Sequence, residues 1–312
     1  MKYNRYINDV PKVSEIGLGA WQLGINSGWK SMTEKEAIYM VHKSIELGVN
    51  FFDTAPVYGL GTGELRLGKA LKIYDRSKIV INTKFGRSEK GEINFNSNNI
   101  RESLEGSLKR LQVDYIDSII IHSPPIEYLD GNDNDHYEIL EKLMDEGKIK
   151  AYGASLDTFE EMKLLIKTTN SKVIEAFFNI FHQDAARAFD LAKKQDVGII
   201  AKIPLDSGWL SGKYNSDSTF DDIRKRWSRK DIKIRADLTE KVKNIIKQNN
   251  LAQTAISFCL AYDAVSTVIP GNITIEQLDS NLESIKNPIS KELVKKLEDF
   301  YKNEVKHLNL PW

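Results

Sequence analysis

Short apolar runs alternate along the chain with longer amphipathic segments. The runs are rich in β-branched residues and end at turn-forming residues, which is typical of buried strands. The segments between them are long enough to form helices, so the pattern predicts repeated strand–helix units. We predict eight strands, at residues 14–19, 50–53, 79–84, 115–122, 149–155, 173–179, 198–204 and 265–270.

The segments between the strands carry helical spacing and signals for helix ends. One predicted helix begins after Thr33, a candidate N-cap with Glu36 three residues further on. Another ends near Gly147, because glycine commonly follows the last turn of a helix. The positions expected to face the sheet are Ala37, Met40, Val41, Ser44 and Ile45 in the first helix, and Ile139, Leu140 and Leu143 in the second.

Several predicted strands, such as 118–121 and 198–201, are apolar on both faces. That character is typical of parallel strands covered by helices. Eight strand–helix units without a break in composition favour an α/β protein with a single (β/α)8 TIM barrel spanning 1–312, rather than a doubly wound sheet. The long insertions 124–135 and 206–235 follow strands, so we expect them at the C-terminal face, where active sites of barrels are built.

Composition and charge narrow the classes of function. Of the 312 residues, 41% are hydrophobic and 28% are charged, as in an ordinary globular protein. Lys plus Arg equals Asp plus Glu at 44 each, so no net charge recruits nucleic acid or anionic lipid. No apolar run approaches the roughly 18–20 residues that span a membrane, and residues 1–5 do not resemble a signal peptide. The single cysteine, Cys259, predicts a packed core thiol in a cytoplasmic protein.

Four polar residues near predicted strand ends are the strongest functional signal. Asp53 ends one strand and Tyr58 follows it in a loop, while Lys84 ends the next strand. His122 ends the strand after that. Three of these residues also have a structural explanation: Asp53 could cap a turn, Tyr58 could be an aromatic at the rim, and His122 could be a hydrogen-bonded core histidine. Lys84 needs a partner if it is buried. Because all four converge on one mouth of the barrel, the combination favours an acid–base site.

A phenol, an ammonium, a carboxylate and an imidazole can together carry out proton transfer. A free phenol has a pKa of about 10 and exchanges protons poorly at neutral pH. A neighbouring ammonium lowers that pKa, and a carboxylate keeps the ammonium charged and oriented. An imidazole beside the phenol can donate a hydrogen bond to a carbonyl oxygen. The set suits protonation of an alkoxide as a hydride reaches the carbon.

The four residues resemble the catalytic tetrad of the aldo-keto reductase family. The resemblance covers nearly the whole chain and implies the same barrel fold. It implies that Tyr58 is the proton donor, with Lys84 and Asp53 tuning it. It also implies that His122 orients the substrate. Further family motifs occur in order at 13–21, Glu64 with 67–71, Thr83, 113–117, Pro124, 147–149, 210–213 and 268–271.

The resemblance also implies an extended nicotinamide dinucleotide, NADP(H), bound without a Rossmann domain. Residues 59–63 do not match a dinucleotide fingerprint and predict a turn. We expect Thr274 to cap a helix whose N-terminus binds phosphate. The expected cofactor contacts are Ser155 and Glu175 at the nicotinamide; Pro204, Leu205, Ser207, Gly208 and Leu210 at the pyrophosphate; and Gly271, Asn272, Thr274, Gln277 and Asn281 at the adenosine.

The chain departs from the family pattern at both ends of this cofactor site. At the nicotinamide, Leu156 replaces a common asparagine, Glu175 a glutamine and Lys202 a stacking aromatic. At the adenosine, Gly271 and Gln277 stand where the family often places basic residues that grip the 2′-phosphate. NAD(H) is therefore an alternative cofactor.

Three tryptophans, Trp21, Trp29 and Trp209, are predicted to lie at the mouth, either as an apolar wall for an aldehyde, ketone or sugar or as packing residues. The acidic run 130–135 is expected to be a solvated loop, and the five histidines have no His-x-x-x-His pair, so no metal is implied. The sequence leaves the substrate, the direction of reaction and the oligomeric state open.

The leading hypothesis is a nicotinamide-dependent carbonyl reductase or sugar-alcohol dehydrogenase. A regulatory protein resembling potassium-channel β subunits, which bind cofactor on the same fold, is the alternative from another class. A third hypothesis is a lyase that forms a Schiff base on Lys84. The tetrad favours the first.

Overall fold

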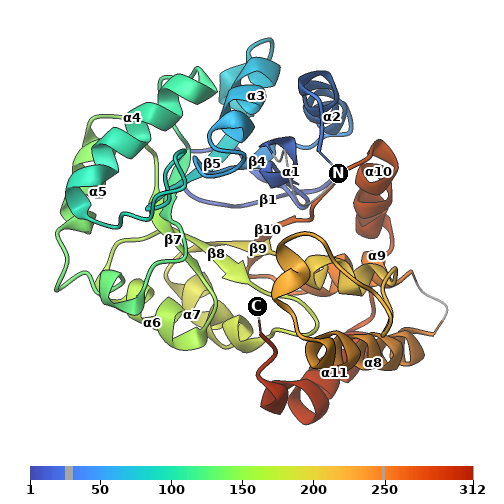
Figure 1. Cartoon of the computed structure of the whole chain (residues 1–312). Helices are drawn as coiled ribbons and strands as arrows, with labels where there is room; N and C mark the ends of the chain where they lie inside the picture. Colours follow the sequence, from blue (N-terminus) through green and yellow to red (C-terminus); the bar gives the residue numbers. More distant parts are fainter. Residues whose placement is uncertain (25–30, 248–249, 312) are drawn as a thin grey trace.

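Eight parallel strands form a barrel surrounded by helices in the computed structural model, which describes residues 1–24, 31–247 and 250–311 (Figure 1). Each strand pairs with its neighbour in chain order. The last strand closes on the first through Val268, whose N–H donates to Glu15 O at 2.9 Å and whose oxygen accepts from Gly17 N at 2.9 Å. The predicted barrel is confirmed. The strands are β3 (Leu18–Gly19), β4 (Phe51–Asp53), β5 (Val80–Phe85), β6 (Ser118–Ile121), β7 (Tyr152–Leu156), β8 (Val173–Phe177), β9 (Gly198–Lys202) and β10 (Val265–Ile269).

The helices form a ring around the strands (Figure 1). Thr33 caps the helix that follows it through a capping box with Glu36, as its sequence predicts. Gly147, with φ +71°, lies directly beyond another helix and confirms the predicted stop. The helices are α1 (Trp21–Gly24), α2 (Glu34–Glu46), α3 (Thr62–Leu71), α4 (Ile100–Leu111), α5 (His136–Asp145), α6 (Phe159–Thr168), α7 (Phe189–Lys194), α8 (Arg229–Ile246), α9 (Leu251–Leu260), α10 (Ile275–Leu282) and α11 (Lys291–Phe300).

The first predicted strand, 14–19, is divided in the structure. Its start forms β2 (Val13–Ser14), which pairs antiparallel with β1 (Tyr3–Asn4). Its end forms β3, and the chain bends between the two. The hairpin segment buries apolar side chains against interior residues of the barrel strands, which hydrophobic burial favours. The interior cluster contains Tyr6, Ile7, Val13, Phe51, Val80, Ile120, Ala151, Val173, Ile200 and Ile269.

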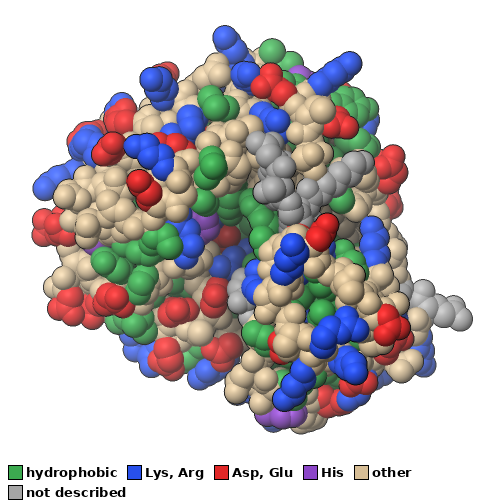
Figure 2. Space-filling model, viewed as in Figure 1, with side chains coloured by type: hydrophobic (Ala, Val, Ile, Leu, Met, Phe, Trp, Pro, Cys, Tyr) green, Lys and Arg blue, Asp and Glu red, His purple; other side chains and the backbone are tan. Residues whose placement is uncertain are grey.

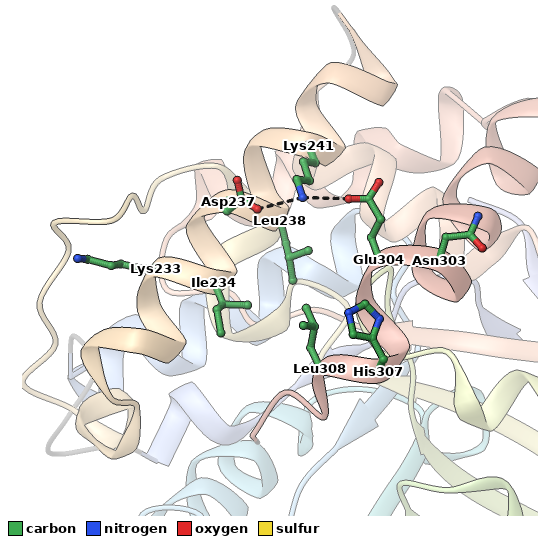
Figure 3. Close-up of a pocket in the computed structure, with 9 residues that line it drawn as sticks. All are labelled: Lys233, Ile234, Asp237, Leu238, Lys241, Asn303, Glu304, His307 and Leu308. Carbon is green, nitrogen blue, oxygen red and sulfur yellow. Dashed lines mark hydrogen bonds and ion pairs between the residues drawn. The ribbon is translucent and has the colours of Figure 1, made fainter.

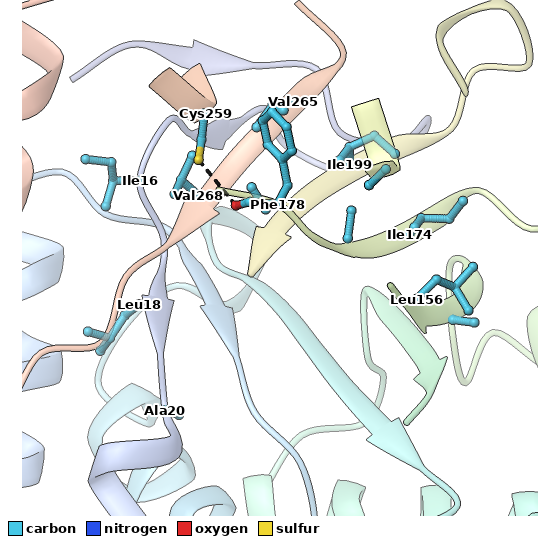
Figure 4. Close-up of a cluster of buried hydrophobic side chains, with 14 of the residues drawn as sticks. Ile16, Leu18, Ala20, Leu156, Ile174, Phe178, Ile199, Cys259, Val265 and Val268 are labelled. Atoms are coloured by element: carbon cyan, nitrogen blue, oxygen red, sulfur yellow. Dashed lines mark hydrogen bonds between the residues drawn. The ribbon is translucent and has the colours of Figure 1, made fainter. Parts of the chain in front are cut away.

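A second apolar layer lies between the strands and the helices. Figure 4 shows part of this layer, including Ile16, Ile174 and Val268. Cys259 lies in it, and its thiol donates to Phe178 O at 3.4 Å. Burial raises the pKa of the Cys259 thiol, so the group is a packed, uncharged thiol as predicted. Within the described part of the chain, no helix is both long and apolar enough to cross a membrane.

The substitution Phe178→Ala should destabilise this layer. Phe178 is fully buried, and its ring centroid lies 5.0 Å from that of Phe189, 5.6 Å from Phe258 and 4.9 Å from Tyr262. We expect a loss of about 3–5 kcal/mol in the free energy of unfolding, because the substitution removes buried area and leaves a cavity. Urea unfolding measures the loss. Phe178→Leu is the matched control with a smaller expected cost, and a loss below about 1 kcal/mol for alanine would contradict the packing described.

Candidate active site

The parallel strands bring the four polar residues to one mouth of the barrel. Asp53 is the last residue of β4 and Lys84 is the penultimate residue of β5. His122 directly follows β6. Since all these strands run in the same direction, their C-terminal ends meet at one face. Figure 2 shows a hollow near the centre of the viewed face, with histidine and basic side chains in its wall.

Tyr58 reaches this face through a tight turn between β4 and α3. Its N–H donates to Ala55 O at 3.1 Å, and Gly61 N donates to Pro56 O at 2.7 Å. Gly59 has φ +60°, and a Cβ atom there would lie 1.8 Å from Gly24 O. Only glycine fits, because any side chain would collide with the backbone of α1. Residues 59–63 are thus a turn leading into a helix, as predicted.

Lys84 is fully buried and held by oxygen atoms. Its Nζ lies 2.7 Å from each carboxylate oxygen of Asp53 and 3.1 Å from Thr54 O. Asn82, two residues earlier on the same face of β5, donates to Asp53 Oδ2 at 2.7 Å. A hydrogen-bonded chain continues from Asn82 through Ser118 to the hydroxyl of Tyr6. The lysine therefore has the partner that its burial requires.

A second carboxylate, from Glu175 on β8, also faces Lys84. Its Oε2 lies 3.0 Å from Lys84 Nζ. Burial, and then the charge of Glu175, raise the pKa of Asp53 to about 7. Burial alone would lower the pKa of Lys84, but attraction to Asp53 and Glu175 raises it well above its ordinary value. Lys84 therefore remains an ammonium throughout the physiological range.

Tyr58 and His122 complete the group. Lys84 Nζ lies 5.2 Å from the centroid of the Tyr58 ring, and the rings of Tyr58 and His122 meet edge to face with centroids 5.8 Å apart. Burial raises the pKa of Tyr58 above its ordinary value, although Lys84 draws it down. The pKa of Tyr58 is thus raised, whereas Lys84 alone would lower it, because desolvation disfavours the phenolate more than the ammonium stabilises it. The phenol therefore keeps its proton at neutral pH.

His122 is an uncharged imidazole in this setting. Burial lowers its pKa well below the ordinary value, and the nearby charges of Lys84, Arg87 and Lys202 lower it further. Its Nδ1 is buried and has no hydrogen-bond partner within the described residues. A neutral imidazole has one N–H donor and one acceptor nitrogen, so His122 can donate one hydrogen bond to a ligand oxygen.

The residues expected at the nicotinamide lie beside this group. Ser155 on β7 pairs in register with Glu175 on β8, and both are almost fully buried. Lys202, at the end of β9, donates to Ser155 Oγ at 2.9 Å and lies 2.8 Å from Asp157 Oδ1. The register thus brings Ser155 and Glu175 to the same side of the mouth.

The loop after β9 has an unusual backbone. Ser207 and Asp206 have φ of +53° and +45°, and Gly208 has φ +97°. Asp206 is fully buried; Arg235 Nε donates to its Oδ2 at 3.2 Å, and His182 Nε2 lies 3.3 Å from its Oδ1. These contacts hold the loop in shape. Its expected cofactor residues include buried Pro204 and Leu210 and half-buried Leu205, Ser207 and Gly208.

The loop before α10 is held by its own polar side chains. Thr274 caps the helix by accepting from Gln277 N, as predicted. Gln277 Oε1 accepts from Ile273 N at 3.0 Å, and Asn281 Nδ2 donates to Asn272 Oδ1 at 2.8 Å. These bonds leave the helix N-terminus as the principal electropositive group of the segment.

A Cβ atom on Gly271, the residue before this loop, would lie 2.4 Å from Gln22 Nε2, so the backbone there packs closely on α1.

The three tryptophans expected at the mouth differ in where the structure places them. Trp209 is fully buried and packs against Tyr214, Phe220 and Trp227, with ring centroids 5.8, 6.1 and 6.3 Å away. Of the two alternatives for Trp209, the structure favours a packing residue, because these rings bury it within the 206–235 insertion. Trp21 begins α1 and is half-buried. Trp29 lies outside the described residues.

A separate hollow lies between α8 and the C-terminal helical segment (Figure 3). Lys241 in its wall is 3.2 Å from Asp237 and 2.9 Å from Glu304, so its charge is balanced. The tetrad residues do not line this hollow, whose lining consists of Lys233, Ile234, Asp237, Leu238, Lys241, Asn303, Glu304, His307 and Leu308.

Comparison with known proteins agrees with this geometry. A family model described as "Aldo/keto reductase family" matches residues 15–302. The aldo-keto reductase YhdN of Bacillus subtilis (strain 168) is 33% identical over 235 residues, covering 72% of this chain and 69% of that protein. L-galactose dehydrogenase of Arabidopsis thaliana is 30% identical, covering 88% and 85%. The holo form of aldo-keto reductase AKR11C1 from Bacillus halodurans has a TM-score of 0.80 at 28% identity, covering 96% of each chain.

The chain therefore belongs to the aldo-keto reductase family. It is an oxidoreductase that uses a nicotinamide cofactor, as the resemblance implied. The relatives are named as reductases and dehydrogenases, which does not favour the regulatory alternative.

Two features of the site were missed by sequence reasoning. The contact between Glu175 and Lys84 joins strands that are three places apart in the barrel. The only sequence signal for it is an acid within an otherwise apolar strand. The chain from Asn82 through Ser118 to Tyr6 was also missed, although Asn82 lies two residues before Lys84 and must share its face.

Proposed function

We propose that the protein interconverts a carbonyl compound and its alcohol with Tyr58 as the proton donor. The observation that carries the proposal is Lys84, buried and bound to Asp53, lying 5.2 Å from the Tyr58 ring. A nicotinamide dinucleotide, when bound, supplies or accepts the hydride. The chain's own residues manage the proton.

Each tetrad side chain has a role that follows from its surroundings. Tyr58 holds a proton at neutral pH and can pass it to the carbonyl oxygen. The ammonium of Lys84 then stabilises the phenolate that remains, and Asp53 keeps that ammonium in place. His122 donates its N–H to the same oxygen and so fixes the substrate's orientation.

The surrounding polar groups fit a dinucleotide. Buried Ser155 and Glu175 offer a hydroxyl and a carboxylate for an amide, and Glu175 Oε2 accepts no hydrogen bond from the described residues. The capped N-terminus of α10 offers backbone N–H groups for a phosphate. We assign Pro204, Leu205, Ser207, Gly208 and Leu210 to the pyrophosphate, and Gly271, Asn272, Thr274, Gln277 and Asn281 to the adenosine.

We propose NAD(H) rather than NADP(H) as the preferred cofactor. The segment from Gly271 to Asn281 contains Glu276 and Asp279 but no Lys or Arg. Gln277 and Asn272 already bond within the loop. A 2′-phosphate there would meet acidic charge without a guanidinium to grip it.

The variant Gln277→Arg should improve NADPH affinity relative to NADH by about 10- to 100-fold, because a guanidinium bonds a phosphate in charge-assisted fashion. Fluorescence titration with both cofactors measures the two dissociation constants. Gln195→Arg, which adds the same charge before β9 at the opposite end of the barrel, is the control. If the ratio of the NADPH and NADH dissociation constants is the same in the Gln277→Arg variant as in the parent, this placement of the adenosine is contradicted.

The substrate class is an aldehyde, a ketone or a sugar. The similarity to L-galactose dehydrogenase supports a sugar or a related polyhydroxy compound. Half-buried Trp21 supplies an apolar surface of the kind on which such carbon skeletons pack.

Turnover tests the function directly. The protein is mixed with NADH and a panel of aldehydes, ketones and sugars, and with NAD⁺ and the matching alcohols, while the absorbance of the reduced cofactor is followed. Conversion of one carbonyl–alcohol pair supports the proposal, whereas tight cofactor binding without any turnover would support a regulatory protein. The Schiff-base hypothesis is disfavoured because Lys84 is kept as an ammonium, which is not nucleophilic. Borohydride trapping of a substrate on Lys84 would revive it.

A further inference from the structure

Glu175 places a second carboxylate inside the catalytic group. It lies on β8 two residues after Val173, an interior residue of the barrel, and therefore points into the barrel as well. Its side chain is 5% exposed, and its Oε2 is 3.0 Å from Lys84 Nζ. Water cannot screen a charge at such a site as it would at the surface.

This carboxylate is not required to satisfy Lys84. An ammonium has three N–H donors. Three oxygens already lie within 3.1 Å of Nζ, two from Asp53 and one from Thr54. Consistent with this, Glu175 Oε2 accepts no hydrogen bond from any described residue. Glu175 is thus in ion-pair contact with Lys84 but adds no hydrogen bond to those from Asp53 and Thr54.

The local charge is consequently unbalanced. Asp53 and Glu175 are two acids facing one ammonium, Lys84. The other buried cation of the group, Lys202, is paired with Asp157 at 2.8 Å. Above about pH 7, where Asp53 is ionised, the mouth of the barrel therefore carries one negative charge that none of these partners neutralises.

We propose that Glu175 makes this protein bind the oxidised cofactor in preference to the reduced one, and so adapts it to oxidise an alcohol. The inference rests on the proposed function. The nicotinamide ring is a cation when oxidised and neutral when reduced, so a buried negative charge beside it stabilises only the oxidised form.

In alcohol oxidation Tyr58 must first release its proton to solvent, leaving a phenolate that Lys84 stabilises. The alcohol hydroxyl then gives its proton to this phenolate while the alcohol carbon gives a hydride to NAD⁺. Two electrons leave the alcohol with the hydride, and NADH and a carbonyl are formed. Glu175 alters the relative affinities for the two cofactor forms and leaves the overall equilibrium constant unchanged.

The variant Glu175→Gln removes the charge and keeps the shape of the side chain. We expect the ratio of the dissociation constants for NAD⁺ and NADH to rise about tenfold, because NAD⁺ alone loses an electrostatic attraction. Quenching of tryptophan fluorescence by each cofactor gives the two constants. Glu175→Asp, which keeps the charge, should hold the ratio within about twofold of the parent.

A wild-type titration keeps the proposal testable even where the glutamine variant does not fold. From about pH 8.5 to about pH 5.5 Asp53 gains a proton, because its pKa is about 7, and the uncompensated negative charge disappears. The preference for NAD⁺ should fall over this range. Among the described residues, the other titratable or charged groups at this site are Tyr6, Tyr58, Lys84, Arg87, His122, Asp157 and Lys202.

The outcomes are distinct. The role of Glu175 is supported if the ratio of the dissociation constants for NAD⁺ and NADH rises in Glu175→Gln and stays constant in Glu175→Asp. An equal loss of affinity for both cofactors in the two variants, or a wild-type ratio that does not change with pH, would overturn it and leave the proposed function intact. No binding of either cofactor by the wild-type protein would overturn the proposed function and this role with it.

Discussion

Reduction of a neutral aldehyde or ketone by the variant Tyr58→Phe should fall by about 10²- to 10⁴-fold in kcat/KM, because the substitution removes the proton donor. The affinity for cofactor should remain close to that of the parent. The phenyl ring keeps the edge-to-face contact with His122, and the ion pair between Lys84 and Asp53 does not depend on the hydroxyl. Steady-state kinetics and fluorescence titration measure the two quantities.

Tyr39→Phe is the matched control for this loss. Tyr39 lies on α2 and is 58% exposed, so removal of its hydroxyl should leave turnover unchanged. Near-normal turnover by Tyr58→Phe would show that the tetrad assignment is wrong. A parallel loss of cofactor affinity would instead show that the hydroxyl belongs to the binding site.

The variant Lys84→Met should lose activity at least as completely and should also be less stable. It leaves Asp53 and Glu175 buried without their cation, and breaking a buried ion pair in this way costs about 3–5 kcal/mol. Urea unfolding gives the free energy of unfolding, and turnover with the same carbonyl gives the activity.

The loss of stability in Lys84→Met should depend on pH. Asp53 already has a pKa raised from 3.8 to about 7 with Lys84 present, and removal of the ammonium raises it further. A carboxyl group whose pKa is raised by folding contributes nothing to stability at low pH, where it is protonated in both states, and it destabilises the fold as the pH rises above its unfolded-state pKa. The difference between variant and parent should therefore be small near pH 4 and should grow as the pH rises through about 7.

A double variant, Asp53→Asn with Lys84→Met, separates stability from catalysis. The asparagine removes one of the two stranded charges, so part of the lost stability should return while activity stays absent. If the loss of stability in Lys84→Met does not depend on pH, or if the double variant recovers no stability, the burial of two acids against the single ammonium of Lys84 is contradicted.

The periodicity of the chain was sufficient to predict the barrel. Eight apolar runs correspond to the eight strands of the barrel, although the first, 14–19, divides between the N-terminal hairpin and β3. The strand ends then placed Asp53, Lys84 and His122 at one mouth, because parallel strands share a direction. Local signals at Thr33, Gly147 and Thr274 were also sufficient to predict where helices begin and end, since helix caps and stops involve neighbours within a few residues.

Predictions about which side chains meet were less successful. Trp209 follows a strand, as a pocket residue would, yet the insertion folds back and encloses it with Tyr214, Phe220 and Trp227. Its burial depends on rings up to 18 positions away whose approach no local pattern specifies.

The sequence by itself determined the barrel, the order of its strands and the four catalytic candidates, because these depend on short-range periodicity and on the direction of parallel strands. Only the tertiary structure decided the electrostatics of the site. Glu175 and Lys84 are 91 positions apart in the chain and meet because the barrel closes, which places their strands across one interior. That contact, together with burial, sets the charge of the mouth, since both the distance between charges and their access to water are properties of the folded chain.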